Sequence, residues 1–465
     1  MALTIFAAGC STGHQAAAPK HATIPSTTTT TSSPSTTAPV AASWTTYGGS
    51  LSRTSLAASF PTVTTAPTEA WTSPDLDGGV YGEPLIDGGQ VIVATENDTV
   101  YGLSASTGKV TWSDHLATPA PAGALPCGDI DPAVGVTSTM VIDPSTDTVY
   151  ASAETETNGA VGHQLFAISL STHRTRWSRD VDQPGWTAAA QLQRIALGLA
   201  DGHVLVAFGG NADDCGAYHG WVVGVPESGT GALEAYQVPT ARQGAIWAPA
   251  GVTVDAAGDV YVATGNGSAT AGQPFDHGDA VIRLSPALTE LSYFAPTNWA
   301  QDNADDGDLG STSPVLLDGG QTFEVGKQTT AYLLDTAALG GIGGQVASLN
   351  VCPSLGGNAY QAPDVYVVCP DAGEIAQVKI GPGNTMARGW TWRSPTGGAS
   401  SPTIAGGVVW SIDLQASVLH GIDEANGTTA YSLPLDVGTP EHFAAPSAAG
   451  AMIVVAGSRA VEAFR

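Results

Sequence analysis

Tyr101-Gly-Leu-Ser-Ala-Ser-Thr-Gly-Lys-Val-Thr-Trp112 is the stretch that decides the fold, because degraded copies of it recur along the chain. In this unit a strand of small and apolar residues runs into a Thr-Gly turn, and a Trp follows four residues after the Gly. The copies are Leu165-Phe-Ala-Ile-Ser-Leu-Ser-Thr-His-Arg-Thr-Arg-Trp177 and Leu419-His-Gly-Ile-Asp-Glu-Ala-Asn-Gly-Thr-Thr-Ala-Tyr431. A repeat of roughly 40–60 residues built from short strands predicts propeller blades or another β array. Such arrays serve in binding, scaffolding and catalysis, so the repeat alone leaves the function open.

The number of strand groups predicts how many blades the array has. Seven groups of four strands follow one another up to Tyr431, and the C-terminal end then supplies only three strands. Glu69-Ala-Trp71 offers the missing fourth strand, which would pair the two ends of the domain and leave no free sheet edge. The sequence therefore predicts an all-β, eight-bladed β-propeller of four-stranded antiparallel blades, with the last blade closed by an N-terminal strand. Seven blades remain the alternative, because the fifth and sixth groups are the least regular. Trp112 and Trp177 are expected to pack between blades.

The charge balance excludes one class of partner. The 465 residues include 42 Asp and Glu but only 15 Lys and Arg, which gives a formal net charge of −27. No basic stripe is present to neutralise phosphates, so we expect no nucleic-acid partner and no adsorption to anionic lipid. The carboxylates either keep a lysine-poor array soluble or, in part, line a cation site. A hydrophobic content of 43% supports a real core.

The N-terminal region predicts a surface anchor. Ile5-Phe-Ala-Ala-Gly-Cys10 resembles a bacterial lipoprotein cleavage box, in which the Cys takes the lipid. Only nine residues precede Cys10 and none of them is basic, so the segment is either a truncated signal, which we favour, or a chance match. Residues 11–43 form a Ser/Thr/Pro-rich tract that cannot bury a core and predicts a disordered stalk. We expect a signal at 1–10, a stalk at 11–43 and the propeller at 44–465, in a monomeric, extracytoplasmic bacterial lipoprotein that meets the membrane only through its lipid.

The remaining cysteines form an even set, as two disulfides in an oxidising compartment require: Cys127, Cys215, Cys352 and Cys369. All four fall in loops on one face of the predicted propeller. Three connectivities are open to four cysteines. We infer the pairs Cys127–Cys215 and Cys352–Cys369.

The repeat resembles a known family. Leu103-Ser-Ala-Ser-Thr-Gly-Lys-Val-Thr-Trp112 is similar to the blade signature of the quinoprotein alcohol dehydrogenase-like (PQQ-repeat) propellers, and the resemblance spans about residues 71–465. That family includes dehydrogenases that use pyrroloquinoline quinone (PQQ) and calcium, and an outer-membrane assembly lipoprotein that binds no cofactor. The resemblance implies the propeller fold and leaves the activity open.

Four further segments resemble the enzymes of the family, particularly the polyvinyl alcohol dehydrogenases. They are Gly244-Ala-Ile-Trp247, Tyr261-Val-Ala-Thr-Gly-Asn266, Trp299-Ala-Gln-Asp302-Asn-Ala-Asp305-Asp306-Gly-Asp308 and Val325-Gly-Lys327-Gln. The resemblance implies the following roles: stacking under the quinone for Trp247, calcium ligation for Asn266 and Asp306, contact with the quinone carbonyls for Lys327, and catalysis for Asp306, Asp308 and Lys327. Aromatic faces hold flat rings, and amide and carboxylate oxygens suit calcium, so the chemistry is consistent.

Each of these residues also has a purely structural interpretation. Trp247 can fill the core, Asn266-Gly can be an ordinary hairpin turn, and residues 302–308 can form a solvated acidic loop. By their place before or after inner strands, all of them should project to one end of the channel, in the fourth and fifth blades. His219, His277 and His442 fall on the same face without metal-ligand spacing, and we interpret them as polar rim residues.

Three departures from the enzymes weigh on the function. Residues 134–139 hold no carboxylate where the second blade's calcium ligand is expected, no adjacent cysteines occur, and no Cys-x-x-Cys-His haem motif is present. We therefore favour a surface-anchored propeller that binds an unknown protein or small-molecule ligand on its loop face, or acts as a scaffold. The alternative is a PQQ- and calcium-dependent alcohol dehydrogenase that oxidises an alcohol or polyol.

Overall fold

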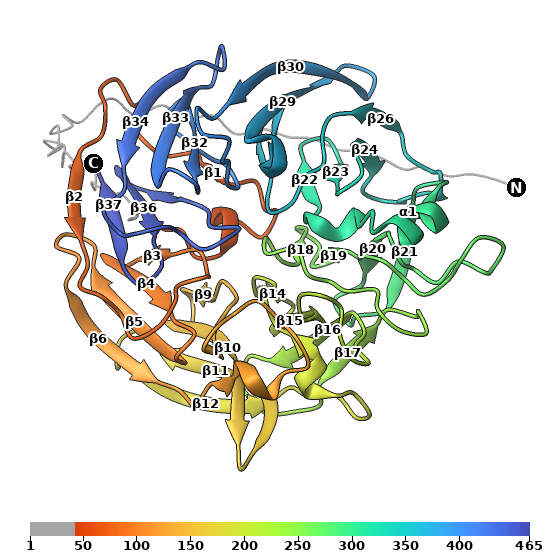
Figure 1. Cartoon of the computed structure of the whole chain (residues 1–465), viewed down its shortest axis with the longest axis horizontal. Coiled ribbons are helices and arrows are strands. Elements are labelled where there is room, and N and C mark those ends of the chain that lie inside the picture. Colours follow the sequence, from red (N-terminus) through yellow and green to blue (C-terminus); the bar gives the residue numbers. More distant parts are fainter. Residues whose placement is uncertain (1–41) are drawn as a thin grey trace, which may run out of the picture. The chain divides into compact units, whose positions relative to one another are not determined.

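A computed structural model describes residues 42–465. Cys10 and almost all of the predicted stalk lie outside the described residues, so the predictions made for them stay predictions. Figure 1 shows eight small sheets arranged in a ring around a central axis. Strands are the main regular elements of the described residues, whose single α-helix is α1 (Trp299–Asp305).

Seven blades are continuous in sequence, and in each of them the chain runs from the inner strand outward through antiparallel neighbours. Their strands are β3 (Leu85–Asp87), β4 (Gln90–Ala94), β5 (Thr99–Ser104) and β6 (Val110–His115); β9 (Val141–Asp143), β10 (Thr148–Thr157), β11 (Ala160–Ser169) and β12 (Arg174–Asp180); β13 (Gln191–Leu192) with β14 (Gly198–Ala200), β15 (His203–Gly210), β16 (Trp221–Pro226) and β17 (Glu234–Gln237); β18 (Thr253–Val254), β19 (Val260–Ala263), β20 (Val281–Leu284) and β21 (Glu290–Ala295); β22 (Val315–Leu317), β23 (Gln321–Val325), β24 (Thr330–Asp335) and β26 (Ala347–Asn350); β27 (Ala359–Gln361), β28 (Asp364–Cys369), β29 (Glu374–Gly381) and β30 (Thr385–Arg393); and β31 (Thr403–Ala405), β32 (Val408–Asp413), β33 (Val418–Asp423) and β34 (Thr429–Pro434).

The eighth blade closes the ring in the predicted way. Its strands β35 (Ser447–Ala449), β36 (Met452–Ala456) and β37 (Val461–Phe464) come from the C-terminal end, and β2 (Glu69–Thr72) pairs antiparallel with β37. Glu69 lies opposite Phe464 in this register. The eight-bladed prediction is thus confirmed, and both ends of the propeller are held in one sheet. Short additions complete the fold: β1 (Leu56–Ala57) beside β31, β25 (Gly341–Ile342) beside β21, the β7 (Ala120–Pro121) and β8 (Ala133–Val134) pair, and the 3-10 turns η1 (Tyr47–Gly49), η2 (Ala122–Ala124), η3 (Ala188–Ala190), η4 (Leu309–Ser311) and η5 (Pro370–Ala372).

The turn glycine of the repeat receives the Trp of the preceding blade. Gly108 has φ 67°, and a Cβ at this position would overlap the indole of Trp71, whose Nε1 donates to the Ala105 carbonyl at 2.9 Å. Two more such pairs are Trp177 with Gly229 and Trp390 with Gly427. Because only glycine combines the left-handed φ with a bare surface, the Thr-Gly turn provides a flat seat for the indole ring. The Trp of one blade therefore fixes its distance from the next.

Trp112 also packs on the corresponding turn of the next blade, but there a histidine takes the place of the glycine. His173 (φ 59°) occupies the turn position that glycine holds in the clearest repeat, and its ring stacks on Trp112 with centroids 5.1 Å apart and planes 6° from parallel. Gly102, on the strand beside Trp112, has no room for a side chain because the indole covers it. The prediction that Trp112 and Trp177 pack between blades is confirmed.

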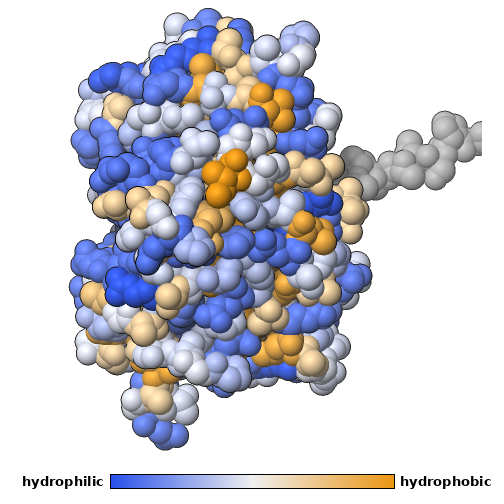
Figure 2. Space-filling model, turned by 90° about the vertical axis from the view of Figure 1, so that its right-hand side faces the viewer, coloured by the Kyte–Doolittle hydropathy of each residue, from blue (hydrophilic) through white to orange (hydrophobic). Residues whose placement is uncertain are grey.

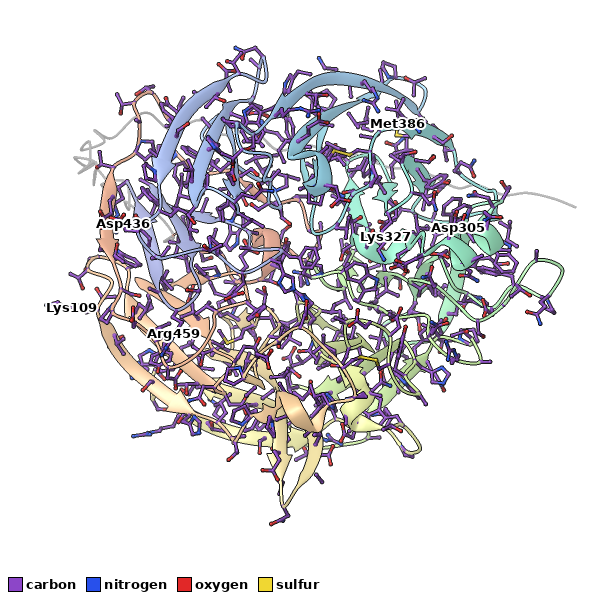
Figure 3. All side chains as sticks on the ribbon, viewed as in Figure 1. Lys109, Asp305, Lys327, Met386, Asp436 and Arg459 are labelled. Atoms are coloured by element: carbon purple, nitrogen blue, oxygen red, sulfur yellow. A yellow bond between two sulfur atoms is a disulfide. The ribbon has the colours of Figure 1, made fainter. Side chains whose placement is uncertain are left out.

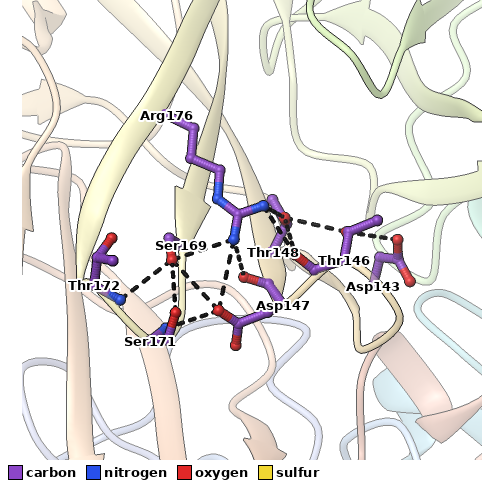
Figure 4. A network of polar contacts seen from close by, with 8 residues as sticks. All are labelled: Asp143, Thr146, Asp147, Thr148, Ser169, Ser171, Thr172 and Arg176. Carbon is purple, nitrogen blue, oxygen red and sulfur yellow. Dashed lines mark hydrogen bonds and ion pairs between the residues drawn. The ribbon is translucent and has the colours of Figure 1, made fainter.

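A polar network fixes the turns of the second blade (Figure 4). Arg176 on β12 donates to the Thr146 carbonyl and the Thr148 hydroxyl, each at 2.8 Å, and to the Asp147 carbonyl at 3.1 Å. The Asp147 carboxylate accepts from the Ser171 amide at 3.0 Å. The β9–β10 turn and the β11–β12 turn are thereby tied together by hydrogen bonds.

An N-terminal strap runs inside the ring and bonds to most of the blades. We call residues 44–57 the strap. Its carbonyl oxygens accept from inner strands of six blades in sequence order: Trp44 from Ile86 at 2.9 Å, Thr45 from Ile142 at 2.8 Å, Leu51 from Val254 at 2.9 Å, Ser52 from Leu316 at 3.2 Å, Thr54 from Tyr360 at 2.8 Å and Ser55 from Ile404 at 2.8 Å. Arg53 adds a seventh blade through the Leu197 carbonyl at 2.9 Å. The strap joins blades that are distant in the ring.

The two predicted disulfides are present. Cys127 pairs with Cys215 and joins the β7–β8 segment to the β15–β16 loop, and Cys352 pairs with Cys369 at the end of β28. Within residues 42–465 no helix is long and apolar enough to cross a membrane. On the face that Figure 2 displays, hydrophobic residues are scattered among polar ones and form no continuous patch.

Candidate functional site

A cavity of about 390 Å³ collects most of the predicted site residues at one end of the ring. Trp247, Asp306, Asp308 and Lys327 all line it, and they come from the loops of the fourth and fifth blades. Other walls come from the second, third and eighth blades, including Arg194, Asn211, Ala212, His442 and Phe443. The prediction that these loops converge on one face is therefore reproduced in the structure.

Lys327 is held at the inner side of the fifth blade. It follows β23, and its backbone amide donates to the Asp308 carbonyl at 2.9 Å, which fixes where the side chain starts. Figure 3 shows Lys327 closer to the ring centre than Asp305, which lies on α1 farther out. The ammonium lies 2.6 Å from Asp308 Oδ2 and 3.0 Å from Asp306 Oδ2. It also lies 5.4 Å from the centroid of the Trp247 ring, within cation–π range.

Asp308 is placed by the chain around Asn266. The Asn266 amide donates to Asp308 Oδ1 at 2.8 Å, and its side-chain Nδ2 donates to Asp306 Oδ1 at 2.8 Å. A Cβ on Gly265 would meet Asp308 Oδ1 at 2.5 Å and the Trp247 Nε1 at 3.2 Å. Glycine at this position therefore allows the carboxylate and the indole to approach the same backbone. Asn266 therefore does more than turn the chain, because its backbone amide and its side-chain amide each hold a carboxylate of the site.

The two carboxylates at Lys327 differ in environment. The side chain of Asp308 is 9% exposed, whereas that of Asp306 is 66% exposed. Burial raises the pKa of Asp308 above its usual value, although Lys327 and the Asn266 amide oppose the shift. Burial disfavours the charged form of Lys327, but the pKa of Lys327 is raised overall because Asp308 and Asp306 outweigh it. Asp308 is thus the carboxylate whose proton affinity the fold tunes.

Part of a hard-cation site is present. Asn266 does not line the cavity itself, but its Oδ1 is buried and has no hydrogen-bond partner in the structure. The Asp306 and Asp308 carboxylates are nearby oxygen donors of the kind that calcium takes, but in this structure they are contacted by Lys327, and Asp306 also by the Asn266 Nδ2. Calcium needs about six to eight oxygens, so a bound ligand and water would have to complete the shell. Within residues 42–465 no group of three or more His, Cys, Asp or Glu side chains is arranged to hold a metal ion.

The aromatic surface of the cavity is larger than Trp247 alone. Phe443 meets Trp247 edge to face, with ring centroids 6.2 Å apart, and Arg194 lies 4.6 Å from the Phe443 centroid on the other side. Sequence reasoning singled out neither Phe443 nor Arg194 as a site residue. One signal was available for Phe443: it precedes the inner strand of its blade within Phe443-Ala-Ala-Pro, as Trp247 does within Trp247-Ala-Pro.

Other acidic and histidine residues of the predicted face lie in different places. Asp302 is buried on α1 rather than solvated, accepts from Asn298 Nδ2 at 2.7 Å, and has a pKa raised to about 6 by burial and by Asp305. The solvated-loop interpretation is therefore wrong for Asp302. His277 packs in an aromatic group and lies 3.1 Å from Glu290, away from the cavity. His442 does line the cavity, and burial together with Arg194 lowers its pKa to about 4.

A second, smaller pocket of about 220 Å³ adjoins the cavity. The two spaces share four wall residues: Asp129, Leu192, Asn211 and Ala212. The outer wall of this pocket is the β7–β8 segment, which contributes Leu125, Ile130 and Val134, and the Cys127–Cys215 disulfide anchors it. The insertion thus adds a side chamber to the mouth of the cavity, with Leu125, Ile130 and Val134 on one part of its wall and Asp129, Asp131 and Asn211 on the rest.

Known proteins share this architecture. Residues 64–252 match the family model described as outer membrane protein assembly factor BamB. No curated protein matches the chain in sequence. Quinohemoprotein alcohol dehydrogenase ADHIIG from Pseudomonas putida HK5 superposes with a TM-score of 0.67 over 91% of this chain and 80% of its own, at 13% identity.

Two further solved structures have the same fold. A europium-containing methanol dehydrogenase gives a TM-score of 0.66, 13% identity and coverage of 89% of both chains. BamB from Moraxella catarrhalis gives 0.59 and 13%, over 86% of this chain and 99% of its own. Identities this low establish the fold, which is shared by enzymes and by an assembly factor. The chain has the β-propeller fold of these proteins, and residues 64–252, which include its first three blades, also match the family model in sequence.

Proposed function

We propose that this propeller is a quinone-dependent alcohol dehydrogenase. The observation that carries the proposal is the convergence of Trp247, Asp306, Asp308 and Lys327, from two blades, on one cavity. A scaffold has no need for a buried carboxylate paired with a lysine above an indole face. The fold neighbours named as quinohemoprotein and methanol dehydrogenases support this choice.

The residues present suit a flat conjugated cofactor. Trp247 and Phe443 supply apolar ring surface, and the cavity of about 390 Å³ lies within the roughly 300–1,000 Å³ typical of small-molecule sites. Lys327 can place its ammonium against a quinone carbonyl, where negative charge would develop. Asn266 and Asp306 would hold the calcium ion, with the incomplete shell filled by ligand and water oxygens.

Asp308 is the proposed general base. It would take the proton from the hydroxyl of the alcohol, and a bound quinone would supply the acceptor for the carbon-bound hydride, so that the alcohol becomes a carbonyl compound. A carboxylate is an efficient base when its pKa lies near the working pH, and burial moves the pKa of Asp308 in that direction. The Lys327 ammonium, 2.6 Å away, favours the ionised form of Asp308 and so opposes the rise in its pKa that burial causes.

The side chamber bears on the substrate. An alcohol with an apolar group could place its hydroxyl at Asp308 and its apolar part against the walls of the 220 Å³ pocket. Burial of each methylene in such a pocket contributes about 0.8 kcal/mol. We therefore propose primary or secondary alcohols that carry an apolar group, with room for a polar group beside Asp129, Asp131 and Asn211.

A second candidate is a binding or scaffold module. Two observations favour it: the match of residues 64–252 to an assembly-factor model, and the lack of any carboxylate at residues 134–139. In either case the two disulfides suit an oxidising compartment outside the cytoplasm. Anchoring through Cys10 belongs to the same proposal. Membrane fractionation of the full chain against Cys10→Ser tests it, and an unchanged distribution would refute lipidation.

An activity assay with matched variants separates the two candidates. The chain is reconstituted with PQQ and calcium, and dye reduction is followed with a series of alcohols. We expect turnover in the wild type, a loss of about 100-fold or more in kcat for Asp308→Asn, and no change for Asp305→Asn, an exposed residue of α1 outside the cavity. Absence of any turnover in the reconstituted wild type would contradict the dehydrogenase and leave the binding module.

A further inference from the structure

Arg194 is a buried cation without an ion pair. It lies between β13 and β14, only 9% of its surface is exposed, and it lines the cavity. Its one hydrogen bond runs from Nη2 to the His442 carbonyl at 3.3 Å. Among residues 42–465 no carboxylate oxygen lies within 4.0 Å of it.

The other fully buried arginine of the chain shows what a purely structural role requires. Arg53, 1% exposed, donates to the Val252, Tyr47 and Leu197 carbonyls and to the Thr46 hydroxyl, at 2.7 to 3.0 Å. A guanidinium has five N–H donors, and burying them without acceptors is costly. Arg194 leaves most of its donors unused, and they are on a cavity wall.

The aromatic rings around Arg194 hold it in place. Its Cζ lies 4.6 Å from the Phe443 centroid and 5.9 Å from the Tyr81 centroid. Stacking of this kind fixes the plane of the guanidinium but leaves its edge free, and the edge carries the donors that pair with a carboxylate in a bidentate manner. The acidic neighbours that act on its charge, Asp129, Glu96 and Glu441, do so from beyond ion-pair distance.

Two aromatic rings, Trp247 and Phe443, lie between Lys327 and Arg194. The chain of contacts runs from Lys327 to Trp247 at 5.4 Å, from Trp247 to Phe443 at 6.2 Å, and from Phe443 to Arg194 at 4.6 Å. Lys327 is already paired with Asp306 and Asp308, so among the described residues that line the cavity Arg194 is the cation left for an incoming anion.

We propose that Arg194 binds a carboxylate of a planar aromatic ligand whose other end reaches Lys327. The inference deepens the proposed function, on which it rests, because PQQ is a planar tricarboxylate. It assigns to this chain a recognition residue in the third blade, far from the segments that resemble the enzymes. An acidic group is expected at the Arg194 end of the cavity, because Arg194 has no carboxylate partner there, whereas Lys327 is engaged by Asp306 and Asp308.

Calorimetric titration tests the assignment without relying on turnover. Three probes are used: PQQ, its trimethyl ester, and naphthalene dicarboxylate, which has a flat acid-bearing ring system but no quinone. The variants are Arg194→Gln, Arg194→Lys and, as the matched control, Arg242→Gln, an exposed arginine on the β17–β18 connection that does not line the cavity. Thermal melting shows which variants remain folded.

We expect Arg194→Gln to weaken both acids by about 10- to 100-fold, the effect of losing a charge-assisted bidentate contact. Arg194→Lys should fall between it and the wild type, and Arg242→Gln should match the wild type. The ester should bind the wild type weakly, and its affinity should not depend on Arg194. If Arg194→Gln does not fold, Arg194→Lys decides the question: this variant should weaken PQQ but leave the affinity for the ester unchanged.

The outcomes separate the inference from the proposed function. Equal affinity of wild type and Arg194→Gln for both acids would overturn the inference, as would the absence of binding by either acid. Naphthalene dicarboxylate binding that depends on Arg194, in a protein that shows no PQQ-dependent turnover, would sustain the anion site and overturn the dehydrogenase.

Discussion

Asp306 and Asp308 are two residues apart, contact the same lysine, and differ in how far the fold exposes them. Asp306 is in the left-handed conformation (φ 57°) that ends α1, so its side chain stays in solvent. The Asp308 carboxylate accepts a hydrogen bond from the Asn266 backbone amide and is buried. The sequence Asp306-Gly-Asp308 gives no sign of this difference, because it arises from contacts made more than 40 positions earlier in the chain, as the 42-residue separation from Asn266 shows.

Buried carboxylates in the first blade predict an unusual pH dependence of stability. Both oxygens of Asp98 are buried without hydrogen-bond partners, and burial, followed by Glu96 and Glu154, raises its pKa to about 9. The folded protein therefore holds a proton that the unfolded chain releases near its ordinary value of 3.8. The stabilisation is complete below that value and is lost as the pH rises towards 9.

We expect Asp98→Asn to flatten the fall in unfolding free energy between pH 5 and 8 by up to about 1.4 kcal/mol per pH unit. Urea unfolding at several pH values measures the slope. Asp75→Asn, at an exposed position, is the control and should keep the wild-type slope. An unchanged slope in Asp98→Asn would show that Asp98 is ionised in the folded state.

At the residue scale the sequence predicted those site residues that sit in local motifs next to strands. Trp247, Asn266 and Lys327 each belong to a short segment whose register fixes its direction. Arg194 does not, since its environment is made by His442 and Phe443, and 248 positions separate it from His442. Such a partner is created only when the ring closes, so no local pattern reports it.

The elements follow from a simple rule, in which runs of Val, Ile and Tyr separated by turn residues become strands. The predicted number and order of the strand groups are confirmed, because each blade repeats the same turn chemistry. Three elements were not predicted: α1, the β7–β8 insertion and the strap. The strap is invisible in the sequence because its bonds to the blades come from backbone carbonyls, which every residue carries.

The packing of Trp71 on the turn glycine Gly108 predicts how much stability a side chain at this glycine would cost. Gly108 and Gly88 both sit in turns of the first blade with positive φ, 67° and 54°, but only Gly108 is covered by an indole, whereas nothing lies within 4 Å of a Cβ on Gly88. Alanine costs about 1–2 kcal/mol at either position through backbone strain. At Gly108 the overlap with Trp71 should add about 1–3 kcal/mol.

Denaturant unfolding of Gly108→Ala and Gly88→Ala, compared with the wild type, measures this difference. If both variants lost the same stability, Trp71 would not be seated on the turn. The paired design removes the strain common to both positions, so the remaining difference reports the contact between the eighth and first blades.

At the scale of the whole molecule, the ring is closed twice. β2 joins the ends through the eighth blade, and the strap links inner strands of blades around the circle. Arg53 is central to the second device, with hydrogen bonds to Val252 and Leu197 on different blades and to the strap itself. The strap holds the inner strands, and thereby the loops that extend from them to the cavity, in fixed positions.

We expect Arg53→Ala to lower the free energy of unfolding by about 2–4 kcal/mol, since four buried hydrogen bonds lose their donor. Arg174→Ala, whose side chain is 78% exposed, should change it by less than about 0.5 kcal/mol. Equal unfolding free energies of the two variants would mean that the hydrogen bonds of Arg53 to the strap and the blades do not stabilise the ring.

The central claim is that the cavity holds a quinone between Trp247 and Lys327, and a direct binding measurement tests it. PQQ is titrated into the calcium-loaded wild type and into a Trp247→Ala, Lys327→Ala double variant, with affinity and stoichiometry read by calorimetry. We predict one equivalent bound at micromolar or better affinity by the wild type, and a loss of at least about 10-fold in the double variant, because ring stacking and charge contact are both removed. Absence of binding at micromolar quinone, or binding that survives both substitutions, would contradict it.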